Sequence, residues 1–374
     1  MRVLVNTRLL IKNKLEGIGW FTFETFKRIT QNNPNVEFIF LFDRPFHQDF
    51  VFGENVIPIK KGLPSRHPIL WYLWFEKTVN SVINQYKPDV FVSPDGYLNL
   101  KTKTKQLAVI HDINFEHHPD WLPKTYSRYY KKNFPKFAQK ATRIATVSEF
   151  SKHDISKQYN VNLNKIDVVY NGYNTNYTSL NKSEIQGARN EISEGKPYIL
   201  FIGSIHPRKN LENQLKAFQL LNNKYSNEYK FVIVGESMWS NKLDIDIDAA
   251  TKQNIVWMGR QSAEALKTII GAAKLMSYVS LFEGFGIPIL EGFSANIPVV
   301  TSNVTSMPEI SNGAALEVNP KNVNEIFEAY QKIMSKENFS PELIQKANTR
   351  LNEFSWDKSA DLLWQSIQKT YHAD

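Results

Sequence analysis

The chain has 374 residues, which is long enough for two domains of about 150–200 residues each. It contains no cysteine, which excludes disulfides and thiolate metal sites and favours a cytoplasmic location. The net charge is +8 and no apolar run approaches the about 20 residues of a membrane span, so an integral membrane protein is not expected.

The basic excess lies in residues 1–180, whereas the remainder is close to neutral. An anionic surface or acceptor that meets only the first half explains this asymmetry, and so do solvated lysines alone. Apolar runs in this half predict the strands Arg2–Asn6, Val36–Phe42, Val90–Ser93, Gln106–His111, Arg143–Val147 and Ile166–Tyr170, separated by helical stretches. Alternation of this kind is typical of a parallel sheet covered on both faces.

Two glycines follow the first predicted strand. Gly17 and Gly19 precede a helix expected from about Trp20 to Thr30. A strand–loop–helix turn at this place brings the backbone close to a phosphate or an acceptor. An ordinary pair of loop glycines is the more common meaning of the same pattern.

The segment Lys124–Arg143 contains no acidic residue. Its basic side chains recur every four residues, and an aromatic series with the same spacing falls on the opposite face of a helix. One interpretation is a surface helix with its aromatic side chains in the core, and the other is an interfacial helix on an anionic bilayer. Pro135 is expected to interrupt the helix.

The second half begins after a polar stretch, residues 176–195, that is the best candidate for a linker. A strand at Tyr198–Ile202 is followed by a glycine-containing loop, by Arg208-Lys209 and by a helix over Leu211–Leu221. Cations at the start of a helix, together with its first amides, form a suitable site for a diphosphate.

Residues 272–301 hold two acids eight positions apart. A strand at Leu275–Ser280 leads to a loop that contains Glu283, then to a helix at Ile287–Ala295 that contains Glu291, and then to a strand at Pro298–Thr301. Glu291 falls on the helix stripe that should pack inward, where a carboxylate is costly without a partner. The stretch therefore predicts a site for an anionic, hydroxyl-rich ligand.

The sequence EGFGIPILE followed by IPVVTSNVTSMPEI resembles the E-x7-E signature of the retaining, GT-B-fold group 1 (family 4) glycosyltransferases. The resemblance spans nearly the whole chain. It implies an α/β protein with two Rossmann-like parallel-sheet domains facing a cleft. The implied division is an acceptor domain over residues 1–175, a linker over 176–195, a nucleotide-sugar donor domain over 196–352 and a C-terminal helix over 353–374 that packs back on the first domain.

The same resemblance implies roles for individual residues. Arg208 and Lys209 would neutralise the nucleotide diphosphate as it leaves. Glu291 would bind the ribose hydroxyls, Glu283 the donor sugar, and His111 would contact the sugar near the reacting centre. The donor loops would be completed by Gly203, Ser204, Phe285 and Gly286.

No metal and no cofactor besides the donor are expected. The acidic stretch Asp244–Asp248 follows polar residues rather than a buried strand, and the pair His117-His118 lacks carboxylates at ligand spacing. The base-binding segment, expected near residues 235–237 and 258–260, carries no motif that separates guanine, uracil and adenine. GDP-mannose is the first donor to try.

The function that follows is transfer of a hexose, mannose first, from a nucleoside-diphosphate sugar to a saccharide or lipid-linked acceptor in surface polysaccharide synthesis. The expected place is the cytoplasm, with peripheral contact to the inner face of the membrane through Lys124–Arg143, and no nucleic-acid partner. Alternatives are a sugar-nucleotide epimerase of the same fold and a catalytically silent, membrane-associated subunit. An oxidoreductase is less favoured because no G-x-G-x-x-G follows the first strand of either half.

Overall fold

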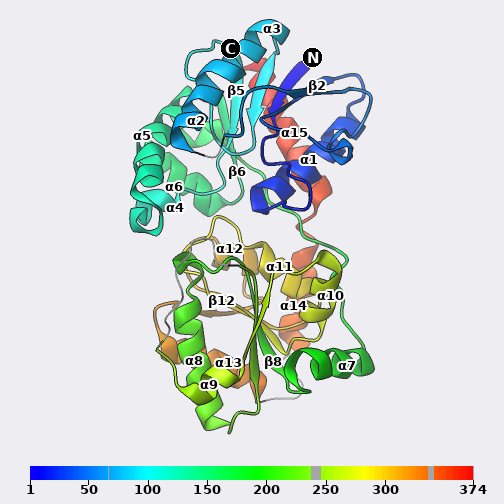
Figure 1. Ribbon diagram of the computed structural model, residues 1–374, viewed down its shortest axis with the longest axis vertical. Coiled ribbons are helices and arrows are strands. Elements are labelled where there is room, and N and C mark those ends of the chain that lie inside the picture. Colours follow the sequence, from blue (N-terminus) through cyan, green and yellow to red (C-terminus); the bar gives the residue numbers. More distant parts are fainter. Residues whose placement is uncertain (66, 237–245, 336–340, 374) are drawn as a thin grey trace. The chain divides into compact units, whose positions relative to one another are not determined.

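The structure is a computed structural model that describes residues 1–65, 67–236, 246–335 and 341–373. The chain forms two compact units. Unit 1 comprises Met1–Gly172 together with Ser355–Asp374, and unit 2 comprises Tyr173–Phe354. Each unit contains one parallel sheet with helices packed on it (Figure 1). The predicted α/β fold with two parallel sheets is confirmed.

Unit 1 has a seven-stranded sheet in the order β3-β2-β1-β4-β5-β6-β7. Its strands are β1 (Arg2–Asn6), β2 (Glu37–Phe42), β3 (Val56–Lys60), β4 (Val90–Ser93), β5 (Lys105–Val109), β6 (Arg143–Thr146) and β7 (Ile166–Val168). Its helices are α1 (Gly17–Asn32), α2 (Pro68–Leu73), α3 (Asn80–Tyr86), α4 (Asn114–His117), α5 (Lys124–Lys140), α6 (Glu149–Tyr159) and α15 (Trp356–His372), with a π-helical turn (Trp74–Val79) between α2 and α3. The central strands are apolar runs because helices cover both faces of the sheet.

Unit 2 has a six-stranded sheet in the order β10-β9-β8-β11-β12-β13. Its strands are β8 (Tyr198–Ile202), β9 (Lys230–Val234), β10 (Ile255–Gly259), β11 (Leu275–Tyr278), β12 (Val299–Ser302) and β13 (Leu316–Val318). Its helices are α7 (Lys182–Ser193), α8 (Leu211–Lys224), α9 (Ala249–Gln253), α10 (Ala263–Gly271), α11 (Ile287–Ser294), α12 (Met307–Ser311), α13 (Val323–Met334) and α14 (Pro341–Leu351). Helices flank the sheet on both sides, with α8 packed on α13 and α11 on α14 (Figure 1).

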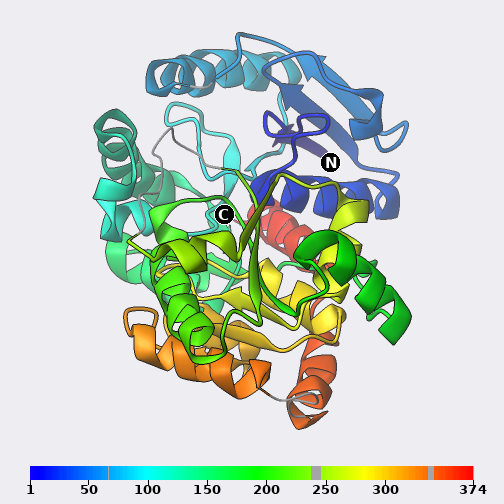
Figure 2. The same ribbon diagram turned by 60° about the horizontal axis from the view of Figure 1, so that its bottom comes forward.

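The last helix, α15, belongs to unit 1. It packs along α1, and the two helices lie side by side in both views (Figures 1 and 2). Its Ser359 hydroxyl donates to the Tyr170 carbonyl over 2.5 Å. Gly172 lies against the first turn of α15 so closely that a Cβ there would stand 2.4 Å from the Trp356 nitrogen. The C-terminal segment is thereby fastened to the end of the first half of the chain.

Three local expectations differ from the structure. Strand β3 was not predicted; it is an edge strand whose Pro58 disguises the pattern. The stretch expected as a linker over 176–195 contains α7, which begins with a capping box between Asn181 and Glu184 and packs on α10. Pro135 does not divide its helix, because the buried side chains of α5 hold it on the sheet as one element.

The aromatic side chains of α5 pack in the core of unit 1, as the first interpretation of this helix predicts. Phe134 is buried, and Tyr126 and Tyr130 pack against the same cluster. Within the described ranges, none of the helices combines the length and the apolar character that crossing a bilayer requires.

Candidate active site

The cation pair lies at the carboxyl end of β8. Arg208 and Lys209 are in a short 3-10 turn, Pro207–Lys209, whose start is capped by the His206 ring accepting from the Arg208 amide over 3.2 Å. The Arg208 carbonyl accepts from the Leu281 amide over 2.8 Å. Since β8 and β11 are neighbours in the parallel sheet, the loops after both strands meet at one edge, as loops that form ligand sites do in such sheets.

Both cations converge on Glu283. Lys209 Nζ lies 2.6 Å from one carboxylate oxygen of Glu283, and Arg208 Nη1 donates to the other. Lys209 also donates to the Tyr278 hydroxyl over 2.8 Å and stands 4.7 Å from the centre of its ring. Two cations and one carboxylate thus meet in a nearly buried cluster.

The electrostatics of this cluster keep Glu283 ionised. Its side chain is only 7% exposed, and burial alone acts to raise its pKa. Arg208 and Lys209 outweigh burial and lower the pKa of Glu283 to about 2. The carboxylate is therefore a permanent acceptor for cations or hydroxyl groups over the physiological pH range.

The loop that carries Glu283 is fastened by serine and threonine side chains. The Ser306 hydroxyl donates to the carbonyls of Glu283 and Phe285, each over 2.9 Å. The Glu283 amide donates to Thr305 Oγ1 over 3.2 Å. Gly286, with φ of +112°, then turns the chain into α11 in a conformation that favours glycine. These contacts hold Phe285 and Gly286 at the amino-terminal end of that helix.

Glu291 lies on α11, the helix that directly follows the loop of Glu283, and it is half-buried. Among the described residues its carboxylate forms no ion pair, so the alternative of a helix acid paired with a neighbouring lysine finds no partner there. Burial raises its pKa to about 7. Burial also raises the pKa of Tyr177 to about 12, with a contribution from the charge of Glu291. A half-buried carboxylate with no ion pair to the described part of the chain is suited to receive hydroxyl groups from a ligand.

Gly203 and Ser204 form the turn directly after β8, and a glycine after β9 packs against it. Gly203 has φ of +150° and Gly235 has φ of +145°. A Cβ on Gly235 would lie 1.9 Å from the Gly203 carbonyl oxygen. Only glycine fits this backbone contact, which shapes the loop in front of Arg208. Residue 237 of the expected base-binding segment and Asp244 of the acidic stretch lie outside the described residues.

The remaining predicted residues lie in unit 1. His111 follows β5, and its Nε2 donates to the Pro94 carbonyl over 2.9 Å. Its ring meets that of Phe21 on α1 edge to face at 5.0 Å. Gly17 and Gly19 are in the first turn of α1, where a Cβ on Gly19 would come within 2.9 Å of the Leu9 carbonyl oxygen and one on Gly17 would meet nothing within 4 Å.

Sequence reasoning missed several residues that complete these arrangements. Tyr278 and Ser306 bind the cluster and its loop, and nothing in their local sequence indicates it. Asn210 directly precedes α8, and its side chain donates to the carbonyls of Val279 and Pro320, over 3.1 and 2.7 Å. It therefore ties the turn after β8 to two other loops at the same edge of the sheet.

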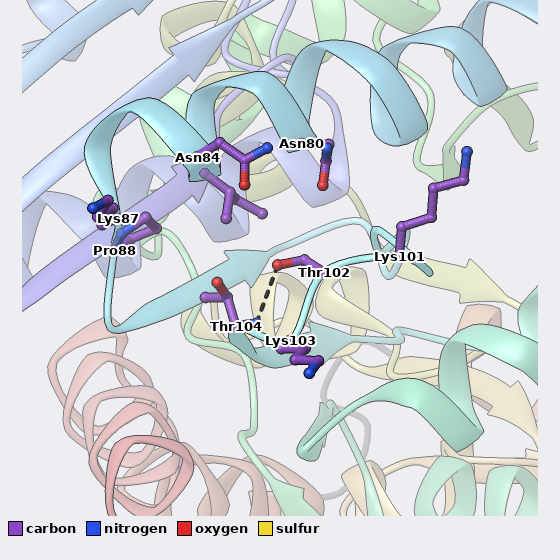
Figure 3. A pocket seen from close by; sticks show the side chains of 9 residues that line it. Asn80, Asn84, Lys87, Pro88, Lys101, Thr102, Lys103 and Thr104 are labelled. Carbon is purple, nitrogen blue, oxygen red and sulfur yellow. Dashed lines mark hydrogen bonds between the residues drawn. The ribbon is translucent and has the colours of Figure 1, made fainter.

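A cavity of about 400 Å³ lies elsewhere in unit 1, at the amino-terminal ends of β4 and β5 (Figure 3). It contains none of the predicted site residues. Within it the Thr104 amide donates to the Thr102 hydroxyl over 3.1 Å. The described ranges contain no group of three or more histidine, aspartate or glutamate side chains placed to hold a metal ion.

Comparison with known proteins follows the same division of the chain. Residues 182–350 match the family model for glycosyl transferases group 1, and residues 15–177 match that for glycosyltransferase family 4. The chain is similar to O-antigen chain mannosyltransferase B of Escherichia coli, with 27% identity over 93% of this chain and 94% of the relative. It is also similar to O-antigen chain mannosyltransferase RfbU of Salmonella typhimurium, with 27% identity over 83% and 82%.

A solved structure supports the fold. HepE of Anabaena, in a complex with UDP and glucose, superposes with a TM-score of 0.73 at 12% identity over 98% of this chain and 99% of that chain. Together the two family models span most of the chain, from residue 15 to residue 350. The protein is an enzyme of the group 1, family 4 glycosyltransferases.

Proposed function

We propose that the enzyme transfers a hexosyl group, mannosyl first, from a nucleoside-diphosphate sugar to a saccharide or lipid-linked acceptor, with retention of anomeric configuration, in surface polysaccharide synthesis. The names of two relatives support mannose and an O-antigen type of product. GDP-mannose is the first donor to test. UDP-sugars are the second, because the Anabaena neighbour was solved with UDP.

The convergence of Arg208 and Lys209 on buried Glu283 carries this proposal. Negative charge grows on the leaving diphosphate as the glycosidic bond breaks, and fixed cations in a water-poor site stabilise it most strongly. The proposed reaction needs no metal, since these side chains supply the positive charge.

The other site residues of unit 2 are assigned by their chemistry. Glu291, half-buried and without a partner among the described residues, accepts hydrogen bonds from the ribose hydroxyls. Glu283 accepts from a hydroxyl of the transferred sugar, and the segment at Phe285 and Gly286 contributes backbone contacts at the start of α11. Gly203 and Ser204 shape the phosphate loop. In unit 1, His111 contacts the transferred sugar, and the turn at Gly17 and Gly19 faces the acceptor or a phosphate.

The test is a donor panel with purified enzyme, assayed for release of nucleoside diphosphate in the presence of lipid-linked saccharides and of EDTA. Arg208→Ala should abolish release. Lys230→Met is a matched control, because Lys230 is a buried lysine of the same sheet that does not belong to the cluster. It pairs with Glu194 over a distance of 3.0 Å. Full activity in a variant lacking both Arg208 and Lys209 would contradict the proposal. Conversion of the donor sugar without any acceptor would identify an epimerase instead.

We also propose that the enzyme works at the inner face of the cytoplasmic membrane and contacts anionic lipid through α5. The outer face of this helix is exposed and carries only positive charge. Helix α2 packs beside it and exposes Ile69 at 66% and Tyr72 at 50%. Exposed cationic side chains with exposed apolar side chains on a neighbouring helix are the composition of interfacial anchors.

Sedimentation with vesicles tests this contact. Binding to vesicles of about 30% phosphatidylglycerol should fall at least tenfold in the Arg128→Glu/Lys132→Glu variant, because each cation near such a surface contributes about 1 kcal/mol. Neutral vesicles should bind weakly. Equal binding of the variant and the wild type to anionic vesicles would contradict the contact.

A further inference from the structure

The turn after β4 has a defined hydrogen-bonded geometry. The Gly96 amide donates to the Ser93 carbonyl over 3.1 Å, which closes a four-residue turn with the sequence Ser-Pro-Asp-Gly. Proline in the second position and glycine in the fourth are typical of a β-turn. The peptide between Pro94 and Asp95 is the middle peptide of this turn.

The orientation of that middle peptide decides what it offers to a neighbour. The two commonest β-turn types differ by a flip of the middle peptide, which exchanges a carbonyl for an N–H on a given side. Here the Pro94 carbonyl accepts from His111 Nε2 over 2.9 Å. A carbonyl cannot donate, so Nε2 carries the proton. Burial lowers the pKa of His111, so the ring is neutral and Nδ1 keeps its lone pair.

The Asp95 carboxylate is held from three sides. Arg8 Nε donates to one of its oxygens over 2.6 Å. The Asn6 side-chain Nδ2 and the Ser93 hydroxyl donate to the other, over 2.8 and 2.9 Å. Arg8 also donates to the Ser65 carbonyl over 3.0 Å. The side chains of Arg8 and Asp95 are only 7% and 4% exposed, so both are largely shielded from water.

The guanidinium of Arg8 is further confined by aromatic side chains. It lies 4.8 Å from one ring centre, 5.5 Å from a second and 5.8 Å from a third, which belong to Tyr97, Phe75 and Trp71. Contacts of this kind fix the plane of a guanidinium as well as its position. The pair thus joins the segments that follow β1 and β4, which are neighbouring strands, and β5, which His111 follows, is the next strand in the sheet.

We propose that Arg8 and Asp95 are positioning residues for the glycosyl-transfer reaction. By holding the Pro94–Asp95 peptide in one orientation, they fix His111 as the tautomer with its proton on Nε2 and its acceptor lone pair on Nδ1. This inference rests on the proposed contact between His111 and the transferred sugar. A buried ion pair contributes weakly to stability compared with apolar side chains of the same size, whereas it fixes a geometry well.

Kinetics with matched variants give the first half of the test. Asp95→Asn and Arg8→Lys should lower kcat by about 10- to 100-fold and leave KM for the donor within about twofold, because small misplacements of a reacting group have effects of this size. Arg143→Lys is the control. Arg143 forms a 2.8 Å pair with Asp167 in the same unit, but it lies at the amino-terminal end of its strand β6, whereas Arg8 and Asp95 follow the carboxyl ends of β1 and β4. An equal loss of kcat in the control, at an equal loss of melting temperature, would overturn the proposal.

The ring ¹⁵N shifts of His111 give the second half, and a merely structural ion pair would leave them unchanged. The resonances are assigned by their loss in His111→Gln. We expect the Nε2-protonated tautomer in the wild type and a mixture of tautomers in Asp95→Asn. A single wild-type tautomer in both Asp95→Asn and Arg8→Lys, with unchanged kcat, would refute the positioning role alone. Full activity of His111→Gln would refute the proposed sugar contact itself, so the two failures are distinguishable.

Discussion

Replacing Glu291 by glutamine should raise the free energy of unfolding of the ligand-free protein at alkaline pH and should weaken the binding of nucleotide. Burial raises the pKa of Glu291 from 4.5 to about 7. Between these two pH values the folded state binds more protons at this group than the unfolded state, so stability falls as the pH rises. Above pH 7 the stability contributed by protonation of Glu291 is lost completely. Each pKa unit corresponds to about 1.4 kcal/mol, and we take about 1.5–3 kcal/mol because the side chain is half-buried.

Glutamine is neutral at every pH and resembles the protonated acid in shape. The melting temperature of Glu291→Gln relative to the wild type should therefore rise from pH 5 to pH 8 by about 3–10 °C. Scanning calorimetry at four pH values measures this difference. Glu264→Gln, an exposed acid on α10, is the control and should show no such trend. A difference that does not change with pH would refute the reasoning, since it would mean that the carboxylate is not destabilised by burial.

The same variant should lose affinity for nucleoside diphosphate by about 10- to 100-fold, the size expected when hydrogen bonds to a charged group are removed. Titration calorimetry at pH 8 measures the dissociation constant. Stability and binding would then change in opposite directions, as at many functional sites. Unchanged affinity would exclude the ribose role of Glu291, whatever the calorimetric melting shows.

Three further predictions concern the cluster and its loop. Glu283→Gln should lower the stability of the ligand-free protein at pH 7 by about 2–4 kcal/mol, because it removes the buried carboxylate that pairs with Arg208 and Lys209. In the wild type the same stabilisation is lost as the pH falls from 4.5 towards 2. Denaturant unfolding measures this, and a free energy of unfolding that does not change over this pH range would show that the ion pairs contribute nothing. Lys209→Met should reduce turnover by about 10²- to 10³-fold in a steady-state assay, and turnover within threefold of the wild type would remove Lys209 from the catalytic cluster. Gly235→Ala should destabilise unit 2 by more than about 3 kcal/mol, because its methyl group would meet the Gly203 carbonyl oxygen at 1.9 Å in a backbone conformation that favours glycine. A melting temperature equal to that of the wild type would show that the loops after β8 and β9 separate freely.

The sheets and the main site loops could be predicted from the sequence because each depends on local pattern. The apolar runs of β8 and β11 are short and bounded by turn residues, and the order of strands and loops then places Arg208 and Glu283 at one sheet edge. Their direct ion pair was not predicted. It joins residues 75 positions apart and depends on side-chain packing around Tyr278 that no local pattern records.

The errors have physical causes of the same kind. Pro135 was weighed by its local effect on a helix, but burial of Phe134 and Phe137 on the sheet outweighs the lost hydrogen bond. The segment before β8 was interpreted from its polar composition, although Asn181 and Glu184 already form the capping signature that starts α7. The hydrogen bonds from Asn6, Arg8 and Ser93 to the Asp95 carboxylate could not be predicted, because they join residues from segments far apart in the sequence.

The most direct test of the central claim is titration calorimetry of the ligand-free enzyme with GDP, UDP and ADP, repeated on Arg208→Ala and on Lys230→Met. We predict that one nucleotide binds with much higher affinity than the others, that this binding is lost in Arg208→Ala, and that Lys230→Met retains it. Equal affinity of the wild type and Arg208→Ala for every nucleotide would contradict the claim that the cluster of Arg208, Lys209 and Glu283 receives the diphosphate of the donor.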